Sequence, residues 1–125
     1  MAEHFRYETN KPDALLAVPL HVQRLSERGF NQSELIAQQL QQQLSIPLLS
    51  QSAKRLRNTS TQASLTAIER RRNMRKAFSY HASHTIKSIA IIDDVVTTGA
   101  TANELAKTLK ASGVKHVQVW AFARA

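Results

Sequence analysis

Two adjacent carboxylates, Asp93 and Asp94, follow the apolar residues 90–92. Neighbouring buried carboxylates are costly, because like charges destabilise each other and burial penalises the charged form. A site that uses their charge or their acceptor oxygens would offset this cost. Carboxylates can accept hydrogen bonds from sugar hydroxyls or lie beside a metal ion. The pair is therefore the first candidate for functional chemistry.

A hydroxyl-rich turn follows the acid pair. Thr97, Thr98 and Thr101 supply hydroxyl donors without charge, and Gly99 lets a ligand approach the backbone closely. Thr101 and Glu104 have the spacing of a capping box, so a helix is predicted to begin there, and helix starts favour anions. The turn predicts a phosphate site and the acids predict sugar contacts, which together describe a 5-phosphoribosyl site. The alternative, an acidic strand end capped by a polar turn, leaves this gathering unexplained.

The chain is basic, and much of the excess charge is local. Its 125 residues include 17 Lys and Arg against 9 Asp and Glu, for a net charge of +8. Residues 54–76 hold eight of these cations and one acid, Glu69. This cluster favours a polyanionic partner, either a phosphorylated small molecule or nucleic acid. A solvated basic helix face is the alternative interpretation.

Composition narrows the class of protein. A hydrophobic content of 42% and a charged content of 21% indicate a globular domain. The length suits a short polar lead-in at 1–14 and a single domain at 15–125. With no cysteine, disulfides and thiolate metal sites are excluded. The apolar runs are too short to cross a bilayer and residues 1–13 lack a signal-peptide core, so we expect a cytoplasmic protein without membrane contact.

Strand and helix patterns alternate along the chain, which predicts an α/β domain with a mainly parallel sheet. Ligands bind such sheets at the carboxyl ends of the strands, where Asp93 and Asp94 stand. In the last strand Trp120 and Phe122 alternate, and core packing is expected for at least one of them. The predicted elements are a strand at 15–20, a loop at 21–30, a helix at 31–45 capped by Asn31, one or two short strands in 48–57, a loop at 58–66, a helix at 66–76, a strand at 86–92, a helix from 101 to the stop at Gly113 and a strand at 116–123.

Residues 90–101, AIIDDVVTTGAT, resemble the signature of the type I phosphoribosyltransferases. Residues 18–37 and 55–78 are similar to two further stretches of the ComF subgroup, which is linked to competence and DNA uptake. The three blocks cover most of residues 15–123. The resemblance implies a three-layer fold, in which helices flank a mainly parallel sheet of about five strands.

The resemblance also implies a donor substrate, phosphoribosyl pyrophosphate (PRPP), bound with Mg²⁺. Asp93 and Asp94 would contact the ribose 2′- and 3′-hydroxyls and stabilise charge that develops on the ring. The Mg²⁺ ion would be held mainly by PRPP itself and would lie near these two acids. The turn that would wrap the 5′-phosphate, mostly through its backbone, comprises Val96, Thr97, Thr98, Gly99, Ala100 and Thr101.

The pyrophosphate of PRPP would lie against residues 19–30 and a closing loop at 58–66 with basic flanks. Arginine suits such contacts because its planar fork binds phosphate oxygens in pairs. Arg71, Arg72, Arg75 and Lys76 cannot all face one ligand, since successive helix residues point about 100° apart. The expected pyrophosphate contacts are Arg24, Arg28, Gly29, Arg55, Arg57 and Arg70.

Two classes of function follow from the resemblance. The first is an enzyme that displaces pyrophosphate from the anomeric carbon, linked to DNA uptake or nucleotide salvage, with a nucleobase or another nitrogen compound as the unknown acceptor. The second is a non-catalytic module of the same fold, which would help to handle single-stranded DNA or competence proteins. A homodimer is a candidate assembly for either. ComF proteins usually begin with a cysteine-rich zinc segment, which a short gene or a truncated chain would lack, and residues 1–14 are too short for a hood that selects the acceptor.

Overall fold

The structure is a computed structural model of the chain. It describes residues 11–20, 22–50, 52–56, 68, 77–81, 86–96 and 99–124. The predicted loop at 58–66 lies outside the described residues, and so does the predicted helix at 66–76 apart from Ile68.

The central sheet is parallel. Its strands lie in the order β1 (Ala14–Ala17), β4 (Ser88–Val96) and β5 (His116–Arg124). Residues 47–49 extend the sheet beyond β1, because the N–H of Leu15 donates to the carbonyl of Pro47 over 2.8 Å and the N–H of Leu49 donates to the carbonyl of Leu15 over 2.9 Å. The α/β class and the parallel sheet are therefore confirmed. The sheet of the described residues has three strands, fewer than the five or so expected.

Strand β4 is longer than predicted at its carboxyl end. The prediction stopped at Ile92, but Val95 and Val96 remain paired with β5, opposite Ala123 and Arg124. This pairing continues the strand beyond the acids. The acid pair therefore lies within the strand, and the turn expected to begin at residue 95 starts after Val96.

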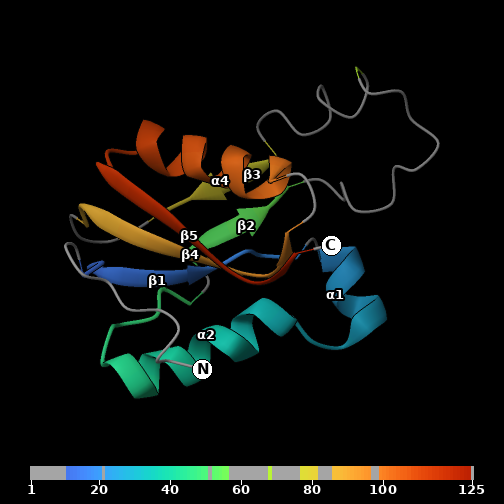
Figure 1. The fold of residues 1–125 in the computed structure, drawn as a ribbon. Helices are drawn as coiled ribbons and strands as arrows, with labels where there is room; N and C mark the ends of the chain where they lie inside the picture. Colours follow the sequence, from blue (N-terminus) through green and yellow to red (C-terminus); the bar gives the residue numbers. More distant parts are fainter. Residues whose placement is uncertain are drawn as a thin grey trace.

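Helices cover both faces of the sheet, so the domain has three layers. Helix α2 (Gln32–Leu44) lies on one face and α4 (Ala100–Ala111) on the other (Figure 1). Alternate residues of a strand point to opposite faces. Ile91 packs with Leu105 and Leu109 of α4 in one buried cluster, whereas Ile92 packs with Leu40 of α2 in the other.

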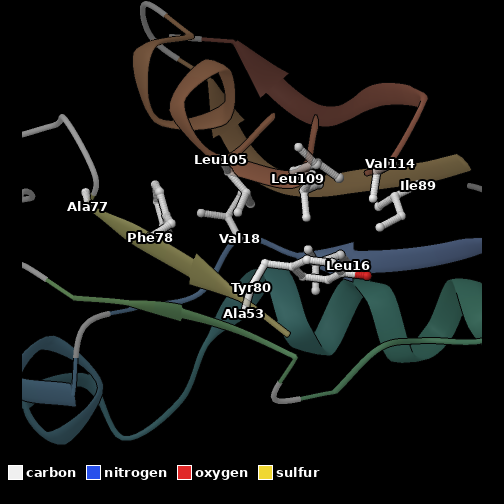
Figure 2. Close-up of a cluster of buried hydrophobic side chains, with 11 residues drawn as sticks. Leu16, Val18, Ala53, Ala77, Phe78, Tyr80, Ile89, Leu105, Leu109 and Val114 are labelled. Atoms are coloured by element: carbon white, nitrogen blue, oxygen red, sulfur yellow. The ribbon is translucent and has the colours of Figure 1, made fainter. Parts of the chain in front are cut away.

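A small antiparallel sheet closes the α4 side of the core. It pairs β2 (Ala53–Arg55) with β3 (Phe78–Tyr80). Figure 2 shows Phe78 and Tyr80 gathered with Leu105 and Leu109 of α4 over Leu16 of β1. Burying one such side chain contributes about 2 kcal/mol, so this cluster holds α4 and β2 firmly beside the sheet. Trp120 is buried in the cluster under α2 and the partly buried Phe122 packs against it, which confirms the core packing predicted for at least one of them.

The predicted helix 31–45 is confirmed as α2, with Asn31 as its cap. The Oδ1 of Asn31 accepts hydrogen bonds from the N–H groups of Ser33, at 3.0 Å, and Glu34, at 3.4 Å. The Glu34 side chain accepts instead from the hydroxyl of Ser50 at 3.3 Å, although a capping box predicts that it reaches back to Asn31. The left-handed conformation of Ser45 ends the helix.

Two helix starts differ from the predictions. Residues 21–30 were predicted as a loop, but α1 (Val22–Arg28) forms there because this stretch has no Gly or Pro before Gly29. Gly29, with φ 81°, ends α1, and its N–H donates to the carbonyl of Leu25 over 2.7 Å.

Helix α4 is capped by Gly99, with φ 82°, so Thr101 lies inside its first turn. The predicted capping box at Thr101 is therefore wrong, whereas the stop at Gly113, with φ 109°, is confirmed.

Among the described residues, no helix combines the length and the apolarity that crossing a bilayer requires.

Candidate functional site

A cavity of about 200 Å³ opens at the carboxyl ends of β1 and β4. Four separate parts of the chain meet there: the residues after β1, the junction of α1 and α2, strand β2, and the segment from β4 into α4. This is the edge of a parallel sheet at which ligands bind. The residues that line it are Val18, Leu20, Arg28, Asn31, Gln32, Ser33, Arg55, Asp93, Asp94 and Thr101.

The two acids are divided between the faces of the sheet. Asp93 follows the alternation of Ile91, which faces α4, and Asp94 follows that of Ile92, which faces α2. Their surroundings agree with this division, because Asp94 contacts Ser33 of α2 while Asp93 lies close enough to Arg55 to feel its charge. Neighbours in sequence therefore serve opposite walls of one cavity.

Ser33 holds Asp94 in place. Its hydroxyl donates to Oδ1 of Asp94 over 3.4 Å and accepts from the N–H of Asp94 over 3.2 Å. Ser33 is 4% exposed, so this pair of hydrogen bonds is sheltered from water. A second contact ties the same region together, because the side-chain amide of Asn31 donates to the carbonyl of Val18 over 3.0 Å. The start of α2 is thus fixed to the ends of β1 and β4.

Asp93 is buried, with 9% of its surface exposed. Burial is the main reason why its pKa is raised to about 6, and the charge of Asp94 raises it further. The positive charge of Arg55 lowers the pKa of Asp93 but only partly offsets these effects. Asp93 therefore changes its protonation state near neutral pH, as acids at functional sites often do.

Arg55 reaches the same wall from β2. Its Nη2 donates to the hydroxyl of Thr101 over 3.4 Å, and its guanidinium carbon lies 5.2 Å from the centroid of the Phe78 ring. Arg55 is also 9% exposed, and burial lowers its pKa although Asp93 raises it. A cation so nearly removed from water is unusual unless it is paired.

The first turns of two helices border the cavity. Gln32 and Ser33 belong to the first turn of α2, and Thr101 belongs to the first turn of α4. Helix starts carry partial positive charge and outward-pointing N–H groups, which favour anions. Arg28 adds a full charge at the rim. The cavity therefore offers positive groups on both sides of a carboxylate pair, which suits a phosphorylated polyol.

The structure brings together five of the residues predicted for the site: Asp93, Asp94, Thr101, Arg28 and Arg55. Gly29, Gly99 and Ala100 are neighbours of lining residues but do not line the cavity themselves. Thr97, Thr98, Arg57 and Arg70 lie outside the described residues, as do the side chains of Arg24 and Val96.

The sequence interpretation missed part of the α2 wall. Ser33 and Gln32 received no functional role, and Asn31 was read as a helix cap alone. One signal could have found them, because the Asn31 cap places a helix start directly after the segment expected to bind pyrophosphate. The pairing of Ser33 with Asp94 spans 61 residues and has no local signal in the sequence.

In the part of the chain that the structure describes, no three His, Cys, Asp or Glu side chains converge as metal ligands would. The acid pair therefore stands without a third acidic or histidine ligand from these residues. This arrangement differs from a protein-made metal cage, which supplies most of the ligands itself.

No family model matches the chain. It is 43% identical to competence protein F of Haemophilus influenzae over 122 residues, which are 95% of this chain and 53% of that protein. It is 42% identical to the DNA utilization protein YhgH of Escherichia coli O157:H7 over 113 residues, 90% of this chain and 50% of that protein. Competence protein ComFC of Streptococcus pneumoniae is 30% identical over 110 residues, 87% of this chain and 47% of that protein.

The chain thus spans about half the length of the curated relatives it matches. All three relatives have names that refer to competence or to DNA utilization.

Proposed function

We propose that this chain is a PRPP-binding, phosphoribosyltransferase-like protein of the ComF type. The observation that carries the proposal is a cavity that holds Asp93 and Asp94 between two helix starts and two arginines. A phosphorylated sugar needs both kinds of group, acceptors for its hydroxyls and positive charge for its phosphates.

The proposed ligand lies along the sheet edge. The ribose hydroxyls donate to Asp93 and Asp94, and the 5′-phosphate lies at the start of α4. The pyrophosphate then falls on the α1 and α2 side, where Arg28 and Gln32 line the cavity. This orientation follows the sequence motif, in which the acids precede the phosphate turn.

Mg²⁺ fits the proposed site as part of the bound substrate. Mg²⁺ prefers oxygen ligands and commonly takes one or two from carboxylates and the rest from phosphates and water. Asp93 and Asp94 supply such oxygens at the cavity. The ion would neutralise charge on the departing pyrophosphate.

The proposed reaction is displacement at the anomeric carbon. The bond from this carbon to the pyrophosphate oxygen breaks, and a bond to a nitrogen of the acceptor forms, with loss of a proton from that nitrogen. The residues of the chain contribute position and electrostatic stabilisation, and the carboxylates lie where positive charge develops on the ring. The acceptor is left open, because the lining residues do not define a pocket for a particular base.

A role in competence or DNA uptake is the second part of the proposal. Relatives named competence protein F and DNA utilization protein support it, as does the net charge of +8. If the basic surface holds single-stranded DNA, binding weakens steeply as salt concentration rises, since phosphate contacts release counterions. If this chain binds DNA no better than an unrelated domain of equal charge, DNA handling loses its support.

Calorimetry with PRPP in the presence and absence of Mg²⁺ tests the main proposal. The wild-type chain should bind PRPP with Mg²⁺, and Asp94→Asn should weaken that binding at least tenfold. Asp13→Asn is a matched control, because Asp13 lies at the amino end of the sheet, where its carboxylate accepts from the N–H groups of Lys87 and Ser88. Failure of the wild-type chain to bind PRPP would contradict the proposal.

A further inference from the structure

Two contacts hold the guanidinium of Arg55 in one place. Phe78, its cross-strand partner, lies under the guanidinium with the ring centroid 5.2 Å away. The hydroxyl of Thr101 accepts from Nη2 at 3.4 Å. An aromatic face and a hydroxyl both orient the group, but neither carries a negative charge to balance it. The arginine is therefore held in position without being neutralised by these contacts.

The positive charge of Arg55 is only partly balanced by negative charge nearby. Its Nε is enclosed and has no hydrogen-bond partner within the structure. The attraction of Asp93 offsets only part of the cost of burial, because the pKa of Arg55 stays below its ordinary value. A buried donor without an acceptor and a buried cation without a full counter-charge are both unfavourable. An anion in the cavity, which Arg55 lines, would supply the missing counter-charge.

The start of α4 marks where such an anion would lie. Helix α4 has 12 residues, and its cap is Gly99, which has no side chain that could bond to the first turn. Thr101 in the first turn is also the residue that Arg55 contacts. A helix start alone is a weak signal, but a 9% exposed arginine that lines the cavity beside it, without a full counter-charge, points independently to a bound anion.

We propose that Arg55 binds the 5′-phosphate of the sugar rather than the pyrophosphate, an assignment that rests on the proposed function. The sequence motif had grouped Arg55 with the pyrophosphate contacts. Its contact with Thr101 instead attaches it to the turn assigned to the 5′-phosphate. Arg55 thereby becomes a residue that recognises the phosphate common to PRPP and ribose 5-phosphate.

Arg28 provides the matched comparison. It also lines the cavity, but it lies in the last turn of α1 and is exposed. It belongs to the segment expected to hold pyrophosphate. The two arginines should therefore respond to different parts of one ligand.

Binding of ribose 5-phosphate and of PRPP with Mg²⁺, measured by calorimetry on three chains, tests this assignment. Arg55→Met keeps an apolar stem over Phe78 and should weaken binding of both ligands by the same factor, tenfold or more. Arg28→Gln should weaken PRPP by a similar factor and leave ribose 5-phosphate within twofold of wild type. If Arg55→Met weakens PRPP but leaves ribose 5-phosphate unchanged, Arg55 serves the pyrophosphate and the inference is wrong.

A second readout uses the wild-type chain and does not depend on how Arg55→Met folds. The Nε–H signal of Arg55 in a nitrogen–proton NMR spectrum, assigned with Arg55→Lys, should shift when ribose 5-phosphate is added. An unchanged signal at saturating ligand would overturn the assignment of Arg55 but not the proposed function. If wild type binds neither ligand, the proposed function fails and this assignment fails with it.

Discussion

Ser33 and Asp94 exchange two hydrogen bonds across 61 residues of sequence, one in each direction. The serine lies in the first turn of α2 and the aspartate near the end of β4. Their contact joins the helix on one face of the sheet to the acid pair at its edge. Asp93, one residue earlier, faces the opposite helix. The two carboxylates still interact, because the charge of Asp94 raises the pKa of Asp93.

Replacing Ser33 with alanine should destabilise the fold and weaken the ligand site. The change leaves the partly buried N–H of Asp94 without its partner, which costs about 1–3 kcal/mol. Urea unfolding should show this loss, and PRPP affinity should fall severalfold because Asp94 is no longer fixed.

Ser50→Ala is the control for this change, because the hydroxyl of Ser50 makes an exposed hydrogen bond to Glu34. It should alter the free energy of unfolding by about 0.5 kcal/mol or less. Equal effects of the two substitutions would argue against a sheltered link between Ser33 and Asp94.

Asp93 should make the stability of the fold depend on pH. Its pKa is about 6 in the folded chain against an ordinary value of 3.8. Between these values the folded state binds more protons than the unfolded state, so this residue's contribution to stability falls as pH rises from about 4 to 6. Asp93→Asn removes the effect and should raise the free energy of unfolding at pH 7.5 by roughly 1–2 kcal/mol.

The test for Asp93 is urea unfolding of wild type and Asp93→Asn at pH 4.5 and pH 7.5. The difference in stability between the two chains should be smaller at the lower pH, where the folded carboxyl is largely neutral, than at the higher pH. A difference of the same size at both values would mean that Asp93 titrates at its ordinary pKa.

Gly99→Ala should lower both stability and affinity. Gly99 has φ 82°, where a side chain costs about 1 kcal/mol, although the added Cβ would meet its nearest neighbour, Asn103, at a comfortable 3.9 Å. Gly113, at the other end of α4, has φ 109° with open space around it. Gly113→Ala should therefore cost similar stability in thermal unfolding but leave PRPP affinity unchanged. Loss of affinity in both variants would show that the effect of Gly99 is a general one.

Removal of Mg²⁺ should separate the two ends of the substrate. A chelator should weaken PRPP binding tenfold or more, because Mg²⁺ neutralises the pyrophosphate oxygens. Binding of ribose 5-phosphate, which lacks them, should change by less than twofold. Calorimetry with each ligand measures both effects, and a chelator effect of equal size on the two ligands would place the ion elsewhere.

The sequence predicted the parts of the fold that local patterns govern. The Asn31 cap and the spacing of Leu40 with its apolar neighbours predicted α2, and the stripe of Leu105 and Leu109 predicted α4. Its errors came where one residue type serves two purposes. Gly29 was read as part of a loop, yet it ends a helix. Thr101 was read as a helix cap, yet Gly99 takes that position.

The candidate site was predictable at its centre and not at its walls. Asp93, Asp94 and Thr101 stand in one continuous motif, and Arg28 and Arg55 line the same cavity. The contacts that tune these residues are long-range. Ser33 meets Asp94 and Arg55 meets Thr101 only because helices and strands distant in sequence pack on the same sheet edge. The spacing of residues along the chain does not predict such long-range contacts.

The central claim is that PRPP binds with its ribose at the acid pair and its 5′-phosphate at the start of α4. A crystal structure of the chain with PRPP and Mg²⁺ at saturating concentration tests it most directly. The account predicts ribose hydroxyls on Asp93 and Asp94 and the 5′-phosphate within hydrogen-bond distance of the first turn of α4. PRPP bound away from this cavity, or a cavity that stays empty of PRPP at saturation, would contradict it.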